Sequence, residues 1–185
     1  MNKTKQRLFV DMDGTLAEFK AVDTLEKLYE KGYFLKLKPN RSVLSSVKLF
    51  KILHPEIEVY ILSSYLSDSK FALTEKNQWL DRYFPEMDSE HRLFIPCGEN
   101  KLDIVPGKAT EKDFLLDDYT LNLNAWEPPA KGIKLLNNIN GTKGTWKKNR
   151  LSMNRSYSDL ATCIYRIMQG EEIVDLPPQM NANEL

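Results

Sequence analysis

The chain has 185 residues, which is enough for a single domain that buries a core of its own. Lysine plus arginine and aspartate plus glutamate both total 26, so the net charge is zero and no overall field attracts nucleic acid or an anionic membrane. The two cysteines, Cys97 and Cys163, are too few for a disulfide framework and lack metal-ligand spacing, so we expect both to be small buried residues in a reducing compartment. No stretch approaches the roughly 20 apolar residues of a membrane span, and the N-terminal residues lack the apolar run of a signal peptide. These properties predict a cytoplasmic protein that binds neither membranes nor nucleic-acid polymers.

Short apolar runs alternate with helical patterns along the chain, which predicts a three-layer α/β fold with a parallel central sheet covered on both faces. The strands are expected at residues 7–10, 58–62, 93–96, 114–116 and 132–136. The helices are expected at about 24–31, with Gly32 as the stop, at 42–53, from 74 onwards with Trp79, Leu80 and Tyr83 on one face, and at 158–169. The stretches 122–129 and 137–146 are expected to be surface loops. We predict one domain over residues 1–175, followed by a flexible tail over 176–185.

The first expected strand ends in Asp11-Met12-Asp13-Gly14-Thr15. Because alternate side chains of a strand share a face, Asp11 and Asp13 point the same way at its end. Gly14 permits a tight turn and a close approach of the backbone to an anion. Taken alone, these residues are explained equally well by a strand followed by an ordinary polar turn.

Residues 18–40 lie between this acidic turn and the helix expected at 42–53. An insertion that directly follows a strand lies beside the carboxyl edge of the sheet, where ligands bind in open α/β folds. We therefore interpret residues 18–40 as a small helical cap over a site, and refer to them as the cap segment. An ordinary crossover helix is the alternative.

Two more expected strands end in polar pairs. Ser63-Ser64 follows the second strand, and its hydroxyls can hydrogen-bond a phosphate oxygen without adding charge. Asp117-Asp118 follows the fourth, where two neighbouring carboxylates are costly unless a cation or solvent offsets them. Common loop chemistry explains each pair on its own. Together with Asp11 and Asp13, however, the four acids would repel a phosphate dianion, so a cation is required, and oxygen ligands beside a phosphate select Mg²⁺.

A lysine is also expected to contact the phosphate. The candidates are Lys70, Lys76, Lys101 and Lys108. Lys76 is favoured because it lies in the first turn of its helix and shares the face of Trp79, where a buried cation is costly unless it meets negative charge. The alternative is a lysine whose charge extends to solvent.

These motifs resemble those of the haloacid dehalogenase-like (HAD) phosphohydrolases, which have a Rossmann-like fold. The resemblance implies that Asp11 is the nucleophile that becomes an aspartyl-phosphate and that Asp13 is the general acid/base. One oxygen of Asp11, the backbone carbonyl of Asp13 and one acid of the later pair, either Asp117 or Asp118, would bind Mg²⁺. The implied phosphate-binding residues are Gly14, Ser63, Ser64 and Lys76.

Within that superfamily the chain resembles the 5'(3')-deoxyribonucleotidases over roughly residues 7–120, through residues 11–19, 32–39, 63–64, 74–84 and 115–118. The resemblance implies hydrolysis of (deoxy)nucleoside monophosphates by a monomer or homodimer, with Phe19 and Phe34 forming a nucleobase pocket. Both aromatic residues could instead belong to the core. Other candidates are a phosphatase for other small phosphate esters, a phosphotransferase, or a receiver-type signalling domain, although receivers place their acidic pair and phospho-acceptor in the opposite order.

Overall fold

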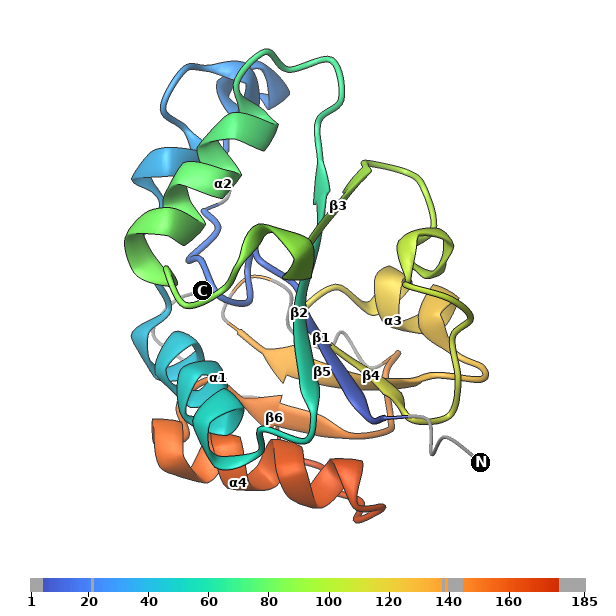
Figure 1. The fold of residues 1–185 in the computed structure, drawn as a ribbon. Coiled ribbons are helices and arrows are strands. Elements are labelled where there is room, and N and C mark those ends of the chain that lie inside the picture. The colour runs from blue at the N-terminus through green and yellow to red at the C-terminus, as the bar shows by residue number, and fades with distance from the viewer. Residues whose placement is uncertain (1–4, 21, 138, 140–144, 177–185) are drawn as a thin grey trace.

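A six-stranded, wholly parallel sheet forms the centre of the molecule, with the strands in the order β3-β2-β1-β4-β5-β6 (Figure 1). The structure is a computed structural model that describes residues 5–20, 22–137, 139 and 145–176. The strands are β1 (Arg7–Val10), β2 (Glu58–Tyr65), β3 (Arg92–Pro96), β4 (Asp113–Asp117), β5 (Lys131–Leu136) and β6 (Arg150–Ser152).

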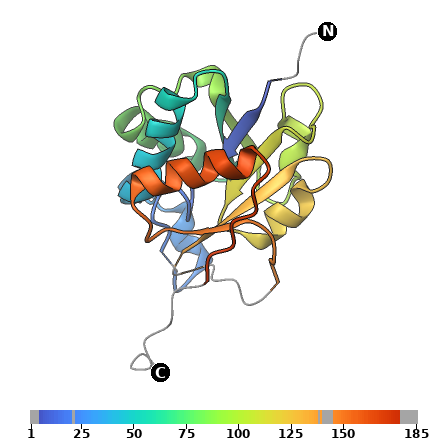
Figure 2. The same ribbon diagram turned by 90° about the horizontal axis from the view of Figure 1, so that it is seen from below.

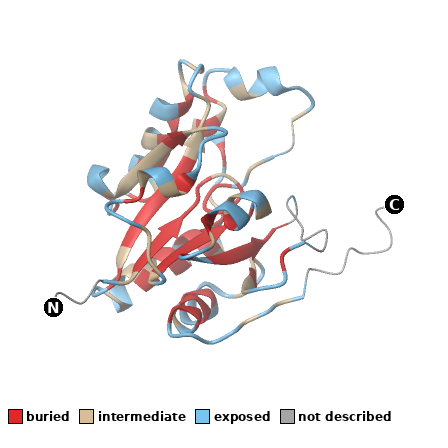
Figure 3. Cartoon of the chain, turned by 90° about the vertical axis from the view of Figure 1, so that its right-hand side faces the viewer, coloured by how far each residue is buried: buried red, intermediate tan, exposed pale blue. Residues whose placement is uncertain are grey.

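Helices cover both faces of this sheet. On one face lie α1 (Arg41–Leu53), α2 (Ala72–Tyr83) and α4 (Tyr157–Met168), and on the other lie α3 (Thr120–Trp126) and the short 3-10 helix η4 (Lys101–Ile104) (Figures 1 and 2). Successive residues of β1 alternate between the two cores, since Leu8 and Val10 pack with the first group and Phe9 with the second. Buried residues accordingly concentrate in the sheet and on the inner sides of the helices (Figure 3). The predicted three-layer α/β fold is confirmed.

Polar contacts at the element ends fix the register of this sheet. The first residues of the central strands β1 and β4 are partners, and Arg7 donates two hydrogen bonds to Asp113, at 2.6 and 2.7 Å, in a buried ion pair. Asn40 and Ser156 cap α1 and α4 by accepting a backbone N–H of the first turn. The strands and helices therefore begin at defined residues, which sets where the opposite ends of β1, β2 and β4 meet.

The cap segment differs from the expectation. The helix expected at 24–31 is a five-residue 3-10 helix, η1 (Leu25–Tyr29), and a second 3-10 helix, η2 (Phe34–Lys36), follows Gly32. None of the five residues of η1 is buried, and Thr24 gives it no side-chain cap, so neither packing nor capping stabilises a longer helix. The described residues of the cap segment therefore form two short 3-10 helices joined by bends and turns.

Other expectations, most of them for short stretches of sequence, were also wrong. The stretch 122–129 was expected to be a loop, yet α3 occupies its first half, and β6 was not expected. Cys97 is exposed, contrary to expectation, whereas Cys163 is buried as expected. The expected tail lies outside the described residues except for Leu176, which is exposed. Among the described residues, no helix has the length and apolarity needed to cross a membrane.

Candidate active site

The turn after β1 brings Asp11 to the carboxyl edge of the sheet. Asp11 N–H donates to Leu116 O at 2.9 Å, which continues the pairing of β1 with β4 one residue beyond the strand. Gly14 follows with a φ of 82°, and a Cβ built at this position would lie 2.3 Å from Asp118 Oδ2. The turn therefore requires glycine both for its backbone conformation and for its contact with the acid at the end of β4.

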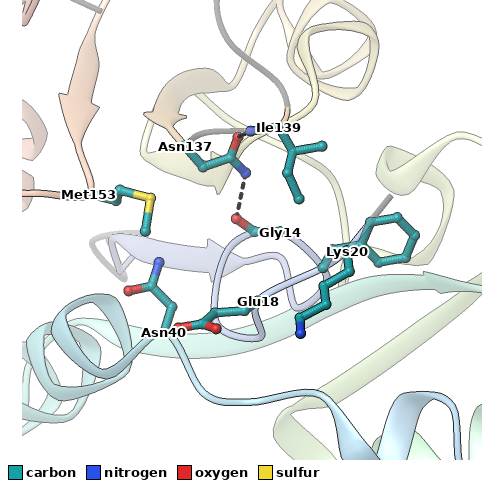
Figure 4. Close-up of a pocket in the computed structure, with 8 residues that line it drawn as sticks. Gly14, Glu18, Lys20, Asn40, Asn137, Ile139 and Met153 are labelled. Carbon is teal, nitrogen blue, oxygen red and sulfur yellow. Dashed lines mark hydrogen bonds between the residues drawn. The ribbon is translucent and has the colours of Figure 1, made fainter. Parts of the chain in front are cut away.

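Asp118 is held by several neighbouring groups. Its Oδ2 accepts a 2.7 Å hydrogen bond from the side chain of Asn137, which also donates to Gly14 O at 2.8 Å (Figure 4). Thr15 Oγ1 lies 3.4 Å from its Oδ1, and the buried Lys134 donates to its backbone carbonyl at 2.6 Å. Asn137, which the sequence did not single out, thus joins the turn after β1 to the end of β4.

Asp117 lies beside Asp118 and is also enclosed. Its Oδ1 accepts from the backbone N–H of Tyr119 at 2.7 Å, and its Oδ2 accepts from Asn122 Nδ2 at 2.9 Å and from Lys101 Nζ at 2.7 Å. Each of its two oxygens therefore already accepts at least one hydrogen bond.

Three carboxylates form one buried group, the acid cluster. Asp11, Asp117 and Asp118 each place an oxygen so that all three lie within 4.8 Å of one another. Three buried carboxylate oxygens at this separation suit a hard divalent cation such as Mg²⁺. The side chain of Asp13 is not part of the cluster.

Asp13 instead pairs with Lys76. Lys76 is fully buried, and its Nζ lies 2.5 Å from Asp13 Oδ2, 3.0 Å from Ser63 Oγ and 2.6 Å from Ser64 O. The other oxygen of Asp13 has no hydrogen-bond partner among the described residues. The structure thus brings the predicted Lys76 to the ends of β1 and β2, and leaves one acceptor of Asp13 available for chemistry.

A second lysine lies at the acid cluster itself. Lys101, 3% exposed at the start of η4, places its Nζ 2.6 Å from Asp11 Oδ1 as well as against Asp117. The sequence ranked Lys76 above Lys101, yet it is Lys101 that contacts Asp11. A four-residue 3-10 helix has no periodic pattern that could have revealed this. Lys70 and Lys108, the other candidates, are exposed.

Burial and charge shift the acid–base properties of this pair. The pKa of Asp11 is raised to about 7, chiefly by burial; Lys101 opposes this shift and the neighbouring carboxylates add to it. Burial favours the neutral amine of Lys101, but Asp11 and Asp117 outweigh it and raise the pKa of that lysine. A divalent cation beside Asp11 would favour its ionised form.

A cleft of about 230 Å³ opens over these groups. Ser63 is buried beside Lys76, and the aromatic ring of Phe34 lies 5.1 Å from Lys76 Nζ. Phe19 lines this cleft and also a second pocket of about 270 Å³ beyond the turn after β1, drawn in Figure 4. The cleft is lined by Asp11, Asp13, Phe19, Leu28, Phe34, Ser63, Ser64, Tyr65, Leu66, Cys97, Asp118, Tyr119 and Asn122. The predicted catalytic, phosphate-binding and aromatic residues therefore lie in and around one cleft.

The chain is similar in sequence to curated proteins. No family model matches the chain. Two curated relatives from Staphylococcus aureus (strains Mu50 / ATCC 700699 and MRSA252) are 27% identical to the chain over 128 residues. Each is named "Putative 5'(3')-deoxyribonucleotidase". The alignment covers 66% of this chain and 63% of each relative's length. Among solved structures, the HAD domain of the effector protein Lem4 from Legionella pneumophila aligns with a TM-score of 0.43 and 14% identity over 77% of this chain and 89% of that chain. The resemblance to 5'(3')-deoxyribonucleotidases that the motifs predict is confirmed by the curated relatives.

Proposed function

We propose that this protein is an Mg²⁺-dependent phosphoric monoester hydrolase that removes the 5' (or 3') phosphate of (deoxy)nucleoside monophosphates. The observation that carries the proposal is the convergence of Asp11, Asp13 and the Asp117-Asp118 pair with two buried lysines at one edge of the sheet. We take residues 1–175 as one catalytic domain, with the cap segment at 18–40 beside the cleft. The names of the curated relatives support the substrate class.

In the first step a carboxylate oxygen of Asp11 attacks phosphorus in line with the ester oxygen. The bond from phosphorus to that oxygen breaks, Asp13 gives it a proton, and the phosphoryl group remains on Asp11 as an aspartyl-phosphate. Lys101, which lies against Asp11, and Lys76 stabilise the charge that develops on the phosphoryl oxygens, and Ser63 and Ser64 add neutral hydrogen bonds.

In the second step Asp13 takes a proton from a water molecule as that water attacks phosphorus. The bond from phosphorus to Asp11 breaks, which releases inorganic phosphate and restores both side chains. The partner-free oxygen of Asp13 is the atom we assign to both transfers: it carries the proton given in the first step and accepts the proton taken in the second.

The acid cluster supports the metal requirement. Asp11 and Asp118, with the backbone carbonyl of Asp13, are the ligands we assign, because both acids line the cleft whereas Asp117 does not. Bound Mg²⁺ supplies positive charge that offsets the carboxylates and the incoming phosphate.

The rim of the cleft supports a sugar alcohol that carries an aromatic base as the leaving group. Phe19 and Phe34 line it, and a nucleobase can stack on such rings. The proposed substrate therefore places its phosphate at Asp11 and its base among these side chains.

The test is phosphate release with Mg²⁺ from deoxyribo- and ribonucleoside 5'- and 3'-monophosphates, deoxyribose 5-phosphate and p-nitrophenyl phosphate. We expect the highest kcat/KM for nucleotides, and a loss of about 10³-fold or more in Asp11→Asn. Asp103→Asn, a change of an exposed aspartate, is the matched control. Substantial turnover by Asp11→Asn would exclude the assigned nucleophile. Equal rates on all esters would favour a general small-ester phosphatase, and a stable phosphorylated protein without steady release would favour a receiver domain.

A further inference from the structure

The proposed mechanism does not use the buried carboxylate of Glu75 on α2. Glu75 is 5% exposed, and it accepts backbone N–H groups of the cap segment: Gly32 at 2.5 Å on Oε1, and Phe34 at 3.1 Å and Leu35 at 3.4 Å on Oε2. A buried carboxylate is costly unless its oxygens are hydrogen-bonded. Three backbone donors from one segment meet this requirement, so Glu75 holds the backbone of η2 in place.

The next residue on the same helix holds the other side of the cleft. Lys76 contacts Asp13, Ser63 and the carbonyl of Ser64. One turn later, Trp79 Nε1 donates to Leu37 O at 2.8 Å, which gives the cap segment a second attachment to α2. One rigid helix therefore fixes the cap segment and the phosphate edge relative to each other.

Phe34 is the residue that this arrangement places. Its backbone N–H is bound to Glu75, its ring lines the cleft, and the same ring lies 5.1 Å from Lys76 Nζ. Phe34 is also the buried residue of η2, whereas η1 has none. The ring packs edge-on against Tyr33 and within the core, and the backbone that carries it is held by the hydrogen bonds to Glu75.

We propose that Glu75 is a positioning residue that fixes Phe34 over the cleft and thereby selects phosphate esters that carry an aromatic base. This inference rests on the proposed function. Glu75 touches no reacting atom and acts through Phe34.

The test compares Glu75→Gln with wild type on a deoxynucleoside 5'-monophosphate and on deoxyribose 5-phosphate, which has the same sugar phosphate without a base. We expect Glu75→Gln to lose about tenfold in kcat/KM on the nucleotide, mainly through KM, and less than about twofold on the base-free ester. Glu30→Gln, the same change at an exposed residue of the cap segment, is the matched control and should change neither. An equal loss on both esters would overturn the inference, because it indicates a general structural role.

A double-mutant cycle tests whether Glu75 acts through Phe34. If it does, adding Glu75→Gln to Phe34→Ala should produce little further loss on the nucleotide. Independent losses that multiply would overturn the inference. If Glu75→Gln does not fold, Glu75→Asp retains the charge, shortens the reach by one methylene and is measured in the same way.

Amide hydrogen exchange of the peptide containing residues 32–37 provides a readout that needs no activity. Exchange should be faster in Glu75→Gln than in wild type or Glu30→Gln, because glutamine has one acceptor oxygen where Glu75 uses two, so the amide of either Gly32 or Phe34 loses its acceptor. Unchanged exchange would overturn the role of Glu75 whatever the activity. Absence of nucleotide hydrolysis in the wild type would instead overturn the proposed function and leave the exchange result to decide the positioning role.

Discussion

Replacing Asp11 by asparagine should stabilise the metal-free protein while it abolishes activity. Asp11 is buried beside two other carboxylates, and Lys101 only partly compensates for the loss of water. Asparagine has nearly the same shape and carries no charge. The substitution therefore removes the unfavourable charge and leaves Lys101 paired with Asp117.

The magnitude follows from the pKa of Asp11, which rises from 3.8 to about 7 on folding. Because the folded carboxyl holds its proton more tightly than the unfolded one, stability falls as the pH rises from about 4 to 7 and stays low above that range. At about 1.4 kcal/mol per pH unit, the ionised carboxylate lowers the free energy of unfolding by at most ~4 kcal/mol above pH 7. At pH 5 the lowering of the free energy of unfolding is roughly 1–2 kcal/mol, because pH 5 lies only part of the way from about 4 to 7.

The assay is urea unfolding with a chelator present, at pH 5 and pH 8, for wild type, Asp11→Asn and Asp103→Asn. Asp11→Asn should raise the free energy of unfolding at pH 8, and the gain should be smaller by roughly 2–3 kcal/mol at pH 5. The exposed Asp103 serves as the control and should show no such difference. A destabilised Asp11→Asn protein at pH 8, or the same gain at both values, would refute the reasoning.

Three further predictions concern the same edge of the sheet. Mg²⁺ at 100 times its Kd should raise the free energy of unfolding by about 2.7 kcal/mol, measured by thermal or urea unfolding. The increase should be smaller at pH 5 than at pH 8, because protons compete with the metal for Asp11. Asp118→Asn should show no increase. Lys101→Met should lower the free energy of unfolding by about 3 kcal/mol and kcat by at least about 10²-fold. The same change at the exposed Lys108 should alter neither quantity. An unchanged kcat in Lys101→Met would contradict the role of Lys101 in stabilising the phosphoryl oxygens. Gly14→Ala should lower unfolding free energy by more than Gly107→Ala, because both have positive φ but only Gly14 has Asp118 within 4 Å of the added Cβ; equal losses would exclude the close contact as the cause.

The strands of the inner sheet could be predicted because they are buried on both faces and therefore appear as continuous apolar runs. The same rule misses β6, which has three residues and only Leu151 fully buried. It also misses α3, where apolar residues alternate with asparagines over seven residues and do not form a helical pattern. In η1 the local sequence favours a helix, but no residue there is buried, so packing does not stabilise a longer α-helix.

The same distinction explains which site residues could be predicted. Asp11, Ser63 and Asp117 lie at or near the carboxyl ends of buried strands, so parallel topology brings them to one edge. Lys101 and Glu75 reach the site from a 3-10 helix and from the side of α2, and only the packed structure shows which groups they meet. Burying either group is unfavourable unless its partners are present, so substituting a partner should lower the free energy of unfolding about as much as substituting the residue itself. Sequence patterns therefore identify the groups that carry the proposed chemistry, whereas the groups that position and neutralise them follow from the three-dimensional packing of connecting segments.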